Sequence, residues 1–200
     1  METTERWDKT FSEGKDFASM NEIFIDEELL PRLEKILPPD VHTLLDIGCG
    51  TGDVLLKMQK RGFRVSGVDA SSVAVEAARG KTSLGNEISV GDLDNGILAQ
   101  IKNGPFGLIT MKLVIAFIKD KPKLFSEIKN LLHLKGVFLV ITPVTYPKMT
   151  YLKTITKGIA VDEESFLSEL GKVFPQIECI HKDYLDDNGI LGYYLCSSGS

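Results

Sequence analysis

Three aspartates in this sequence are well placed for chemistry, because each stands at the end of a short apolar run. Asp46 lies at the end of one run, Asp69 directly follows a second, and Asp92 comes two residues after a third. If these runs are parallel strands, their carboxyl ends meet at one edge of a sheet, where the ligands of open α/β sheets bind. The pattern therefore predicts a crevice lined by three carboxylates.

A glycine-rich loop follows the first aspartate and separates an expected strand from an expected helix. Gly48, Gly50 and Gly52 permit a tight turn and let a ligand approach the backbone without a Cβ in the way. The helix that begins near Asp53 would present free N–H groups to that ligand. A lone glycine-rich loop is a weak signal, but the strand–loop–helix context strengthens it.

The charge of these residues distinguishes between cofactors. A dinucleotide carries a pyrophosphate, which Asp46 would repel, whereas S-adenosylmethionine carries an ammonium group and a sulfonium centre, which it would attract. Asp69, about 17 positions after Gly52, can accept hydrogen bonds from both hydroxyls of a ribose. Asp92 lies beside the same crevice. We therefore expect S-adenosylmethionine as the cofactor and S-adenosylhomocysteine as its product.

The elements that must position these residues alternate between apolar runs and amphipathic helices. Strands are expected over Val41–Ile47, Arg64–Val68, Glu87–Val90, Leu108–Met111, Val137–Ile141, Ile177–Tyr184 and Ile190–Cys196. Helices are expected before Pro38-Pro39, over Asp53–Arg61, from Ser71 or Ser72 to about Arg79, after Asp120 and after Asp162.

This alternation implies parallel pairing through right-handed crossovers, and the turn signal Asp187-Asn188-Gly189 implies a closing hairpin. We expect one domain over residues 1–200. Its fold class is α/β, a doubly wound, mostly parallel seven-stranded sheet with helices on both faces and a C-terminal antiparallel hairpin.

From about Leu44 to Thr142 the sequence resembles the class I S-adenosylmethionine-dependent methyltransferase family, which has a Rossmann-like fold. The stretch from Asp46 to Gly52 looks like the motif that holds the methionine moiety, Asp69 like the acid that binds the ribose, and Asp92 like the acid that faces the adenine amine. The resemblance implies a cofactor-binding core over 41–142. The expected cofactor-binding residues in this core are Asp46, Gly48, Cys49, Gly50, Gly52, Asp69, Ala70, Ser71, Gly91, Asp92, Leu93, Met111 and Lys112.

Two positions depart from the family pattern. Gly107 stands where the family commonly has an acid, and Val137 replaces the second glycine of the segment that follows the fourth motif. Neither change touches an expected cofactor contact. The sequence also lacks an Asn/Asp-Pro-Pro-Tyr motif and a Pro-Cys nucleophile, which argues against amino-group methylation of adenine or glutamine and against carbon-5 methylation of pyrimidines.

The acceptor side carries fewer signals. Segment 143–161 leaves the carboxyl end of the fifth expected strand and contains Tyr146, three lysines and no acid. It is either a wall of an acceptor pocket, suited to an anionic small molecule, or a solvated loop. A general base is needed only when the acceptor must lose a proton, and Tyr146 and His181 are the candidates.

The N-terminal segment 1–22 contains scattered aromatic residues, Trp7, Phe11 and Phe17. Because members of the resembled family often close the site with N-terminal segments, we expect a lid, with Trp7 at the cofactor. The alternative is that these rings pack on the outer helices.

Composition limits the partners. The 200-residue chain has 23 Lys and Arg against 28 Asp and Glu, a net charge of −5, which makes a nucleic-acid partner unlikely. The three cysteines are far apart and no metal site is expected. With no long apolar run, we expect a cytoplasmic enzyme with no membrane partner. The predicted reaction is methyl transfer to oxygen or nitrogen of a small molecule. The alternatives are a methyltransferase for RNA or protein, and a non-enzymatic binding module.

Overall fold

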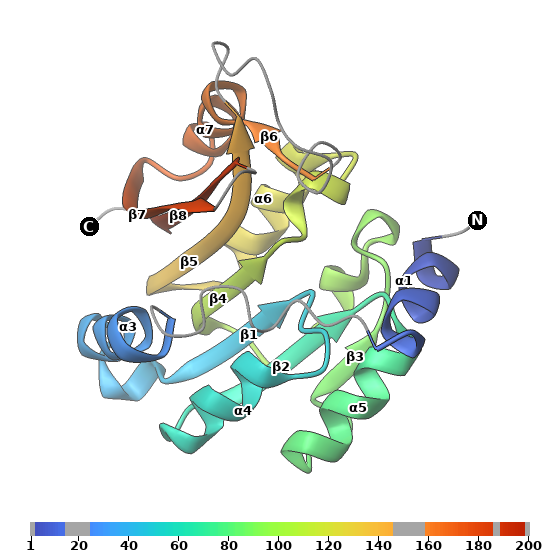
Figure 1. Ribbon diagram of the computed structural model, residues 1–200. Coiled ribbons are helices and arrows are strands. Elements are labelled where there is room, and N and C mark those ends of the chain that lie inside the picture. Colours follow the sequence, from blue (N-terminus) through green and yellow to red (C-terminus); the bar gives the residue numbers. More distant parts are fainter. Residues whose placement is uncertain (1–2, 15–24, 146–158, 186–188, 199–200) are drawn as a thin grey trace.

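A mostly parallel sheet forms the centre of the protein, with the strand order β3-β2-β1-β4-β5-β8-β7 (Figure 1). The computed structural model describes residues 3–14, 25–145, 159–185 and 189–198. The strands are β1 Thr43–Ile47, β2 Arg64–Asp69, β3 Ile88–Val90, β4 Phe106–Lys112, β5 Leu132–Thr145, β6 Val161–Asp162, β7 Gln176–Leu185 and β8 Gly189–Ser197. The two-residue β6 pairs with β5 beside this path.

All seven predicted strands are present, and the predicted doubly wound fold class is confirmed. Strands β1 to β5 pair in parallel, whereas β8 runs antiparallel to both β5 and β7 and so forms the predicted hairpin. The fifth strand is longer than the expected Val137–Ile141. It extends over Leu132–Thr145 because Leu132 pairs with Phe106 of β4 and because β8 pairs with β5 from Val137 to Val144, which satisfies backbone groups beyond the apolar run.

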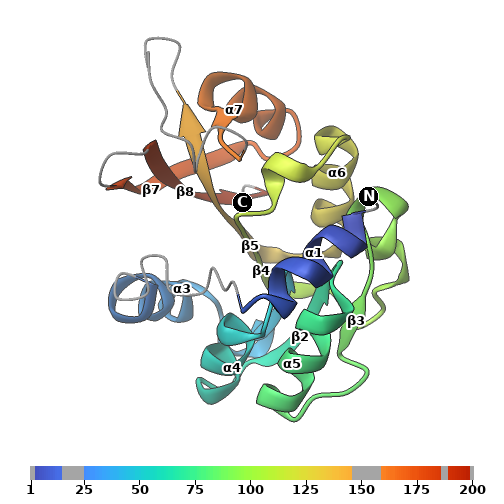
Figure 2. The ribbon, with the colours of Figure 1, turned by 45° about the vertical axis from the view of Figure 1, so that its right-hand side comes forward.

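The helices cover both faces of the sheet (Figures 1 and 2). They are α1 Thr3–Ser12, α3 Leu30–Ile36, α4 Asp53–Lys60, α5 Ser72–Thr82, α6 Lys121–Leu131 and α7 Glu163–Gly171. Short turns of 3-10 helix, Pro39–Val41, Leu93–Asn95, Ile97–Gln100 and Ile115–Phe117, join them. Where the sequence predicts one helix before Pro38, a π-helical turn, Ile25–Leu29, precedes α3.

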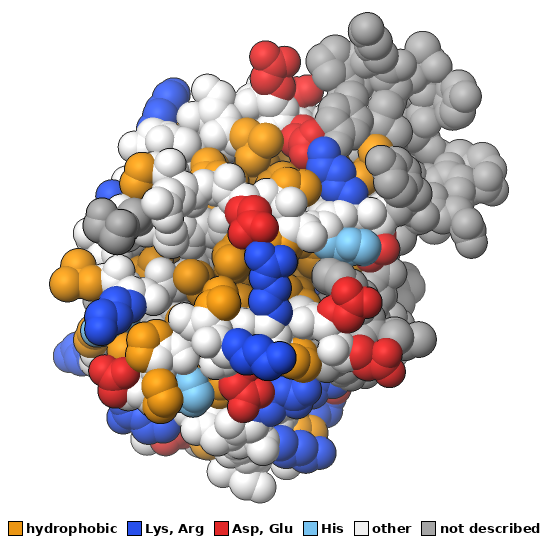
Figure 3. Space-filling model, turned by 90° about the vertical axis from the view of Figure 1, so that its left-hand side faces the viewer, with side chains coloured by type: hydrophobic (Ala, Val, Ile, Leu, Met, Phe, Trp, Pro, Cys, Tyr) orange, Lys and Arg blue, Asp and Glu red, His pale blue; other side chains and the backbone are white. Residues whose placement is uncertain are grey.

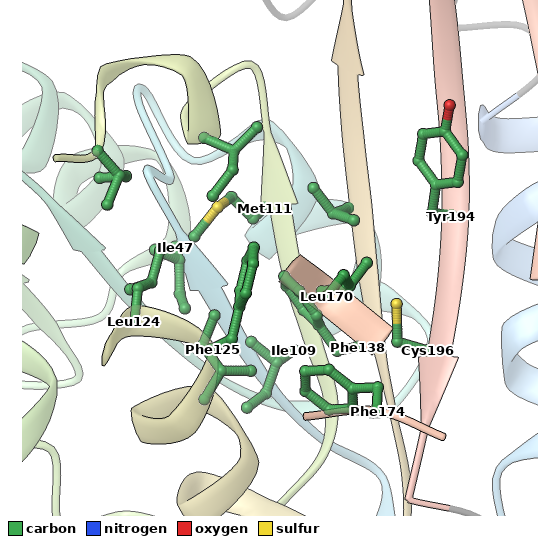
Figure 4. Packing of buried hydrophobic residues seen from close by; sticks show 14 of the residues in the cluster. Ile47, Ile109, Met111, Leu124, Phe125, Phe138, Leu170, Phe174, Tyr194 and Cys196 are labelled. Carbon is green, nitrogen blue, oxygen red and sulfur yellow. The ribbon is translucent and has the colours of Figure 1, made fainter. Parts of the chain in front are cut away.

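Two apolar cores result, one on each face. Buried residues of α3, α4 and α5 pack on one face, and those of α6 and α7 pack on the other. Figure 4 shows the second core, in which Phe125 and Leu170 approach the sheet residues Ile109 and Phe138. Because side chains alternate between faces along a strand, β1, β4 and β5 each feed both cores. None of the helices in the described part of the chain is long and apolar enough to span a bilayer.

Helix starts follow the predicted caps. The Ser71 hydroxyl accepts a hydrogen bond from the Ala74 N–H at 3.1 Å and caps α5. The carboxylates of Asp120 and Asp162 accept backbone hydrogen bonds in the same way at the starts of α6 and α7. The three helices therefore begin where a side-chain acceptor satisfies a free N–H group.

Candidate active site

A cavity of about 150 Å³ opens at the carboxyl edge of the sheet, beside β1 and β4, where the strand order reverses. It brings together residues that lie far apart in sequence. Eleven of the predicted cofactor residues line it: Trp7, Asp46, Gly48, Cys49, Gly50, Asp69, Ala70, Gly91, Asp92, Leu93 and Lys112.

The glycine loop between β1 and α4 forms the floor of this cavity. Gly48 and Cys49 donate their N–H groups to the carbonyl oxygen of Val68, at 2.8 and 3.1 Å, which ties the loop to β2. Gly48 has φ of 73°, and a Cβ there would overlap the side chain of Val114. Only glycine therefore allows this close approach between the loop and the segment after β4.

Asp46 is the most deeply buried acid of the cavity, with 3% of its surface exposed. Its carboxylate accepts a hydrogen bond of 2.6 Å from the Thr110 hydroxyl on the neighbouring strand β4. Burial raises the pKa of Asp46 to about 6, although the Thr110 hydrogen bond opposes this shift, and the negative charge of Asp69 raises it further. A cation bound here would favour the ionised form.

Asp69 lies at the end of β2 and is held by two backbone donors. One carboxylate oxygen accepts the Gly50 N–H at 2.9 Å, and the other accepts the Ser71 N–H at 2.8 Å. Burial raises its pKa above the usual value in spite of these hydrogen bonds. The two oxygens are thus fixed in orientation, and each keeps a lone pair for a ligand hydroxyl.

Asp92 stands on the third side of the cavity. Its carboxylate accepts the Asp94 N–H at 3.0 Å and caps the 3-10 turn Leu93–Asn95. This turn places Leu93 and Asp94 in the lining. Asp92 therefore has a structural partner as well as a place at the cavity.

The segment after β4 supplies the apolar wall. Leu113 adopts φ of 62°, which is unusual for a residue with a side chain, and its N–H donates to the Ile141 carbonyl oxygen at 2.8 Å. The resulting turn brings Val114, Phe117 and Ile118 into the lining. The sequence does not predict these three residues as part of the site, because a left-handed turn at a leucine has no local signal.

Helix α1 covers the cavity from the N-terminal side. Trp7 and Phe11 both line it, and the ring of Trp7 packs edge to face against Phe117 at 5.0 Å. The Arg6 guanidinium lies over both of these rings, 5.4 Å from Trp7 and 5.2 Å from Phe117. The described part of segment 1–22 thus contributes two aromatic rings to the cavity lining, whereas Phe17 lies outside the described residues. The role of this segment as a lid stays a prediction.

Three predicted cofactor residues do not line the cavity. Gly52 precedes α4 with φ of 84° and packs against Ala78, Ser71 caps α5, and the Met111 side chain lies in the core of Figure 4. These three residues are neighbours of lining residues in the chain, but their roles here are in the backbone turn, the helix cap and the core. Cys49 does line it, but burial raises the pKa of its thiol well above the usual value, which suits an apolar filler.

Of the two candidate bases predicted from the sequence, only His181 lies in the described part of the chain. Tyr146 and the lysines of segment 143–161 lie outside the described residues. His181 is on β7, four steps from β1 in the strand order, and does not line the cavity. Its Nε2 is 2.9 Å from the Asp183 carboxylate, and its ring packs on Tyr193. Its role as a base stays a prediction.

The departure at Gly107 has a local explanation. A Cβ on Gly107 would overlap the carbonyl oxygen of Val41, so the chain leaves no room for the acid that the family commonly has there. Val137 lies within β5, where it pairs with Leu108 and with Ser197. Both changes concern packing at the far end of the sheet from the cavity.

Comparison with known proteins agrees with this geometry. The family model described as a methyltransferase domain matches residues 20–175. A lysine methyltransferase of EEF1A from Mus musculus is 28% identical over 181 residues, covering 81% of this chain and 73% of its own length. A ubiquinone biosynthesis O-methyltransferase from Caulobacter vibrioides is 31% identical over 124 residues, covering 60% of this chain and 49% of that protein.

Solved structures share the fold at lower identity. An S-adenosylmethionine-dependent methyltransferase from Clostridium acetobutylicum superposes with a TM-score of 0.64 at 18% identity, covering 98% of this chain and 97% of the other. A TehB-like S-adenosylmethionine-dependent methyltransferase from Corynebacterium glutamicum gives a TM-score of 0.61 at 20% identity, with coverage of 96% and 95%. The chain therefore belongs to the methyltransferase-domain family and is an S-adenosylmethionine-dependent methyltransferase of the class I fold.

Proposed function

We propose that the cavity between β1, β2 and α1 holds S-adenosylmethionine and that the enzyme methylates an oxygen or nitrogen atom of a small-molecule acceptor. The observation that carries the proposal is the set of three carboxylates, Asp46, Asp69 and Asp92, around one glycine-floored cavity. Asp46 and Asp69 are buried, and a buried carboxylate is costly unless a ligand or a hydrogen bond compensates it. A ligand with a cationic end and several hydroxyl and amino donors fits this lining.

Each carboxylate takes a different part of the ligand in this proposal. Asp46, whose pKa is raised to about 6 by burial, faces the cationic methionine end and ionises fully when the cation is present. Asp69, with both oxygens fixed by backbone donors, accepts from the ribose hydroxyls. Asp92 accepts from the adenine amine, while Leu93, Val114 and Ile118 contact the flat ring faces.

Bound S-adenosylmethionine supplies a methyl carbon on a positively charged sulfur, which a lone pair on the acceptor can attack in line. The leaving sulfide is neutral, so the protein needs no general acid. The protein lowers the barrier chiefly by positioning, with the Gly48 to Gly50 backbone, Val114 and the lid residue Trp7 excluding water and fixing the cofactor end of the cavity. An acceptor hydroxyl would additionally lose a proton to water or to a nearby side chain.

The small-molecule acceptor is supported by two observations. Curated relatives named for ubiquinone biosynthesis O-methylation and for demethylmenaquinone methylation match 60% and 61% of this chain. On the face shown in Figure 3, Lys and Arg side chains lie among Asp and Glu side chains, a mixed pattern that does not suit a polyphosphate backbone.

A protein lysine is the second candidate. The EEF1A lysine methyltransferases of Mus musculus and Homo sapiens cover more of this chain, 81%, than the quinone-related enzymes do. A lysine acceptor would reach the methyl group as a neutral amine. It would also need a surface for the surrounding protein.

The experiment is a methyl-transfer assay with tritiated S-adenosylmethionine. The purified protein is incubated in parallel with a panel of phenols, catechols and amines and with a desalted protein extract, and the label is counted in the organic and the precipitated fractions. Label in the organic fraction supports the proposal, whereas label in hydrolysed protein as methyllysine supports the second candidate. The Asp69→Ala variant is the control, because it should lose both signals.

A further inference from the structure

The carboxylate of Asp8, on α1, accepts hydrogen bonds from three residues at the start of α5. Its carboxylate accepts from the Ser71 hydroxyl at 2.7 Å, from the Ser72 hydroxyl at 3.2 Å and from the Val73 N–H at 3.3 Å. The hydrogen bond from Ser71 is the largest cause of a lowered pKa at Asp8. An acid from a distant segment therefore adds a second cap to α5.

Ser71 connects this contact with the cofactor site. Its side chain is fully buried, its hydroxyl donates to Asp8 and accepts from the Ala74 N–H, and its own N–H donates to the Asp69 carboxylate at 2.8 Å. A continuous path of hydrogen bonds thus runs from Asp8 through Ser71 to Asp69. The position of α1 and the orientation of the Asp69 carboxylate are linked by this path.

An adjoining face of α1, which carries Trp7 and Phe11, lines the cavity. Trp7 packs on Phe117, and the ring of Phe11 lies beside Gly50, where a Cβ on Gly50 would make ordinary van der Waals contact with it at 3.5 Å. The contacts between α1 and the rest of the described chain concentrate on α5 (Figure 2). The Asp8 contact is therefore placed to hold the two aromatic rings over the cofactor cavity.

We propose that Asp8 is a positioning residue that fastens α1 over the cavity through Ser71 and Ser72 and thereby fixes the Asp69 turn for the cofactor. The inference rests on the proposed cofactor site. It assigns to this acid of the N-terminal segment a contribution to cofactor affinity without contact with the reacting atoms.

The sequence provides its own reporter, because Trp7 is the one tryptophan in the chain and lies on the helix in question. The experiment compares the wild type with Asp8→Ala, Asp8→Asn and Ser72→Ala. Glu5→Gln is the matched control, since it removes one negative charge from an exposed position of the same helix. Dissociation constants for S-adenosylhomocysteine, Trp7 emission and acrylamide quenching are measured, with far-UV circular dichroism to verify folding.

The proposal expects Asp8→Ala to raise the dissociation constant for S-adenosylhomocysteine by about fivefold to tenfold, a cost of about 1 to 1.4 kcal/mol. Trp7 emission should shift to the red and its quenching should increase. Ser72→Ala should show a smaller effect in the same direction, and turnover at saturating cofactor should change less than the dissociation constant. Asp8→Asn keeps an acceptor oxygen but loses the charge, so its dissociation constant should lie between those of the wild type and Asp8→Ala.

Three outcomes would overturn it. Asp8→Ala could bind S-adenosylhomocysteine as tightly as the wild type, Glu5→Gln could have the same effect as Asp8→Ala, or Trp7 could become exposed with no change in affinity. If Asp8→Ala fails to fold, wild-type affinity and wild-type Trp7 emission in Ser72→Ala would overturn the proposal instead. Failure of the wild type itself to bind would instead contradict the proposed cofactor site.

Discussion

The two halves of the sheet are built differently. On the side of β1, β2 and β3, short strands end in acids and glycines, and the cavity is assembled from those ends. On the side of β5, β8 and β7, strands of nine to fourteen residues pair along their length, and polar groups are buried between them and α7. The polar side chains of the first half therefore line a cavity, whereas those of the second half contact one another.

The second half has its own buried charge. Glu163, at the start of α7, accepts hydrogen bonds from the Tyr194 hydroxyl and from Lys182. A Cβ at Gly192 would overlap the Tyr194 hydroxyl, so the glycine makes room for this contact. The carboxylate of Glu163 is therefore satisfied within the protein, in contrast to the acids at the cavity, which keep lone pairs for a ligand. Substitutions should accordingly affect ligand binding in one half and stability in the other.

The largest expected effect is that of Asp69→Ala. Removing the acceptor of the ribose hydroxyls should raise the dissociation constant for S-adenosylmethionine about 100-fold, or about 2.7 kcal/mol, by calorimetric titration. The loss of stability should be small, because the cost of leaving the Gly50 and Ser71 N–H groups without their acceptor is offset by removal of the desolvation cost of the buried carboxylate. Asp120→Ala, which removes a helix cap away from the cavity, should leave affinity unchanged. Equal affinities for Asp69→Ala and the wild type would contradict the contrast between the halves.

Tyr194→Phe should show the reverse pattern. Glu163 would lose a donor while staying buried beside Lys182, so the free energy of unfolding should fall by about 1 to 3 kcal/mol in urea titrations. Tyr193→Phe is the matched control. Its hydroxyl donates to the more exposed Asp183, so the loss should be smaller. A large drop in S-adenosylmethionine affinity for Tyr194→Phe would show that the halves are coupled.

The pH dependence of binding should report on Asp46. Since the cationic cofactor favours the ionised carboxylate and the pKa of Asp46 is about 6, affinity should increase about tenfold from about pH 5 to about pH 7. Asp69, whose pKa is also raised, should contribute in the same direction. Stability of the free protein should change in the opposite sense. Between the unfolded pKa of 3.8 and about 6 the folded state binds more protons, so stability decreases as pH rises.

The control for this prediction is Asp46→Asn. The variant should bind more weakly, and its affinity should depend less steeply on pH over the same range. A wild-type affinity that stays constant from pH 5 to 7 would contradict a raised pKa at Asp46.

The smallest effect is expected at His181. Its Nε2 is paired with Asp183 and its ring packs on Tyr193, outside the cavity lining, so His181→Asn should lower turnover by about threefold or less. The measurement is the initial rate with the acceptor identified by the tritium assay. A decrease in the initial rate of about 100-fold, typical of a lost general base, would show that a residue of the second half takes part in catalysis.

Much of the first half could be predicted from the sequence. The strands that carry Asp46 and Asp69, the strand before Asp92, the cap at Ser71 and the glycine loop all have short-range signals, since a cap or a turn depends on neighbouring residues. The caps at Asp120 and Asp162, outside this half, have signals of the same kind. Their shared edge follows from the rule that parallel strands alternate with crossover helices. These signals and the family resemblance together predicted eleven of the cavity residues, of which Trp7 was expected from the resemblance alone.

Less of the second half, and of the turn after β4, could be predicted from the sequence. The extension of β5 beyond Ile141 depends on pairing with β8. The contacts of Glu163 with Lys182 and Tyr194 join residues 19 and 31 positions apart. The left-handed turn at Leu113 has no residue signature, because its geometry is imposed by the Ile141 carbonyl and by packing.

The sequence alone determined the fold class, the three acids at one edge and the chemistry of the ligand that they favour, because each depends on residue type and local spacing. Only the tertiary structure decided that α1 lies over the cavity and that Asp8 contacts Ser71, 63 positions away. It also placed His181 away from the cavity. These features depend on which surfaces come into contact when the chain folds, and the local spacing of residue types does not determine those contacts.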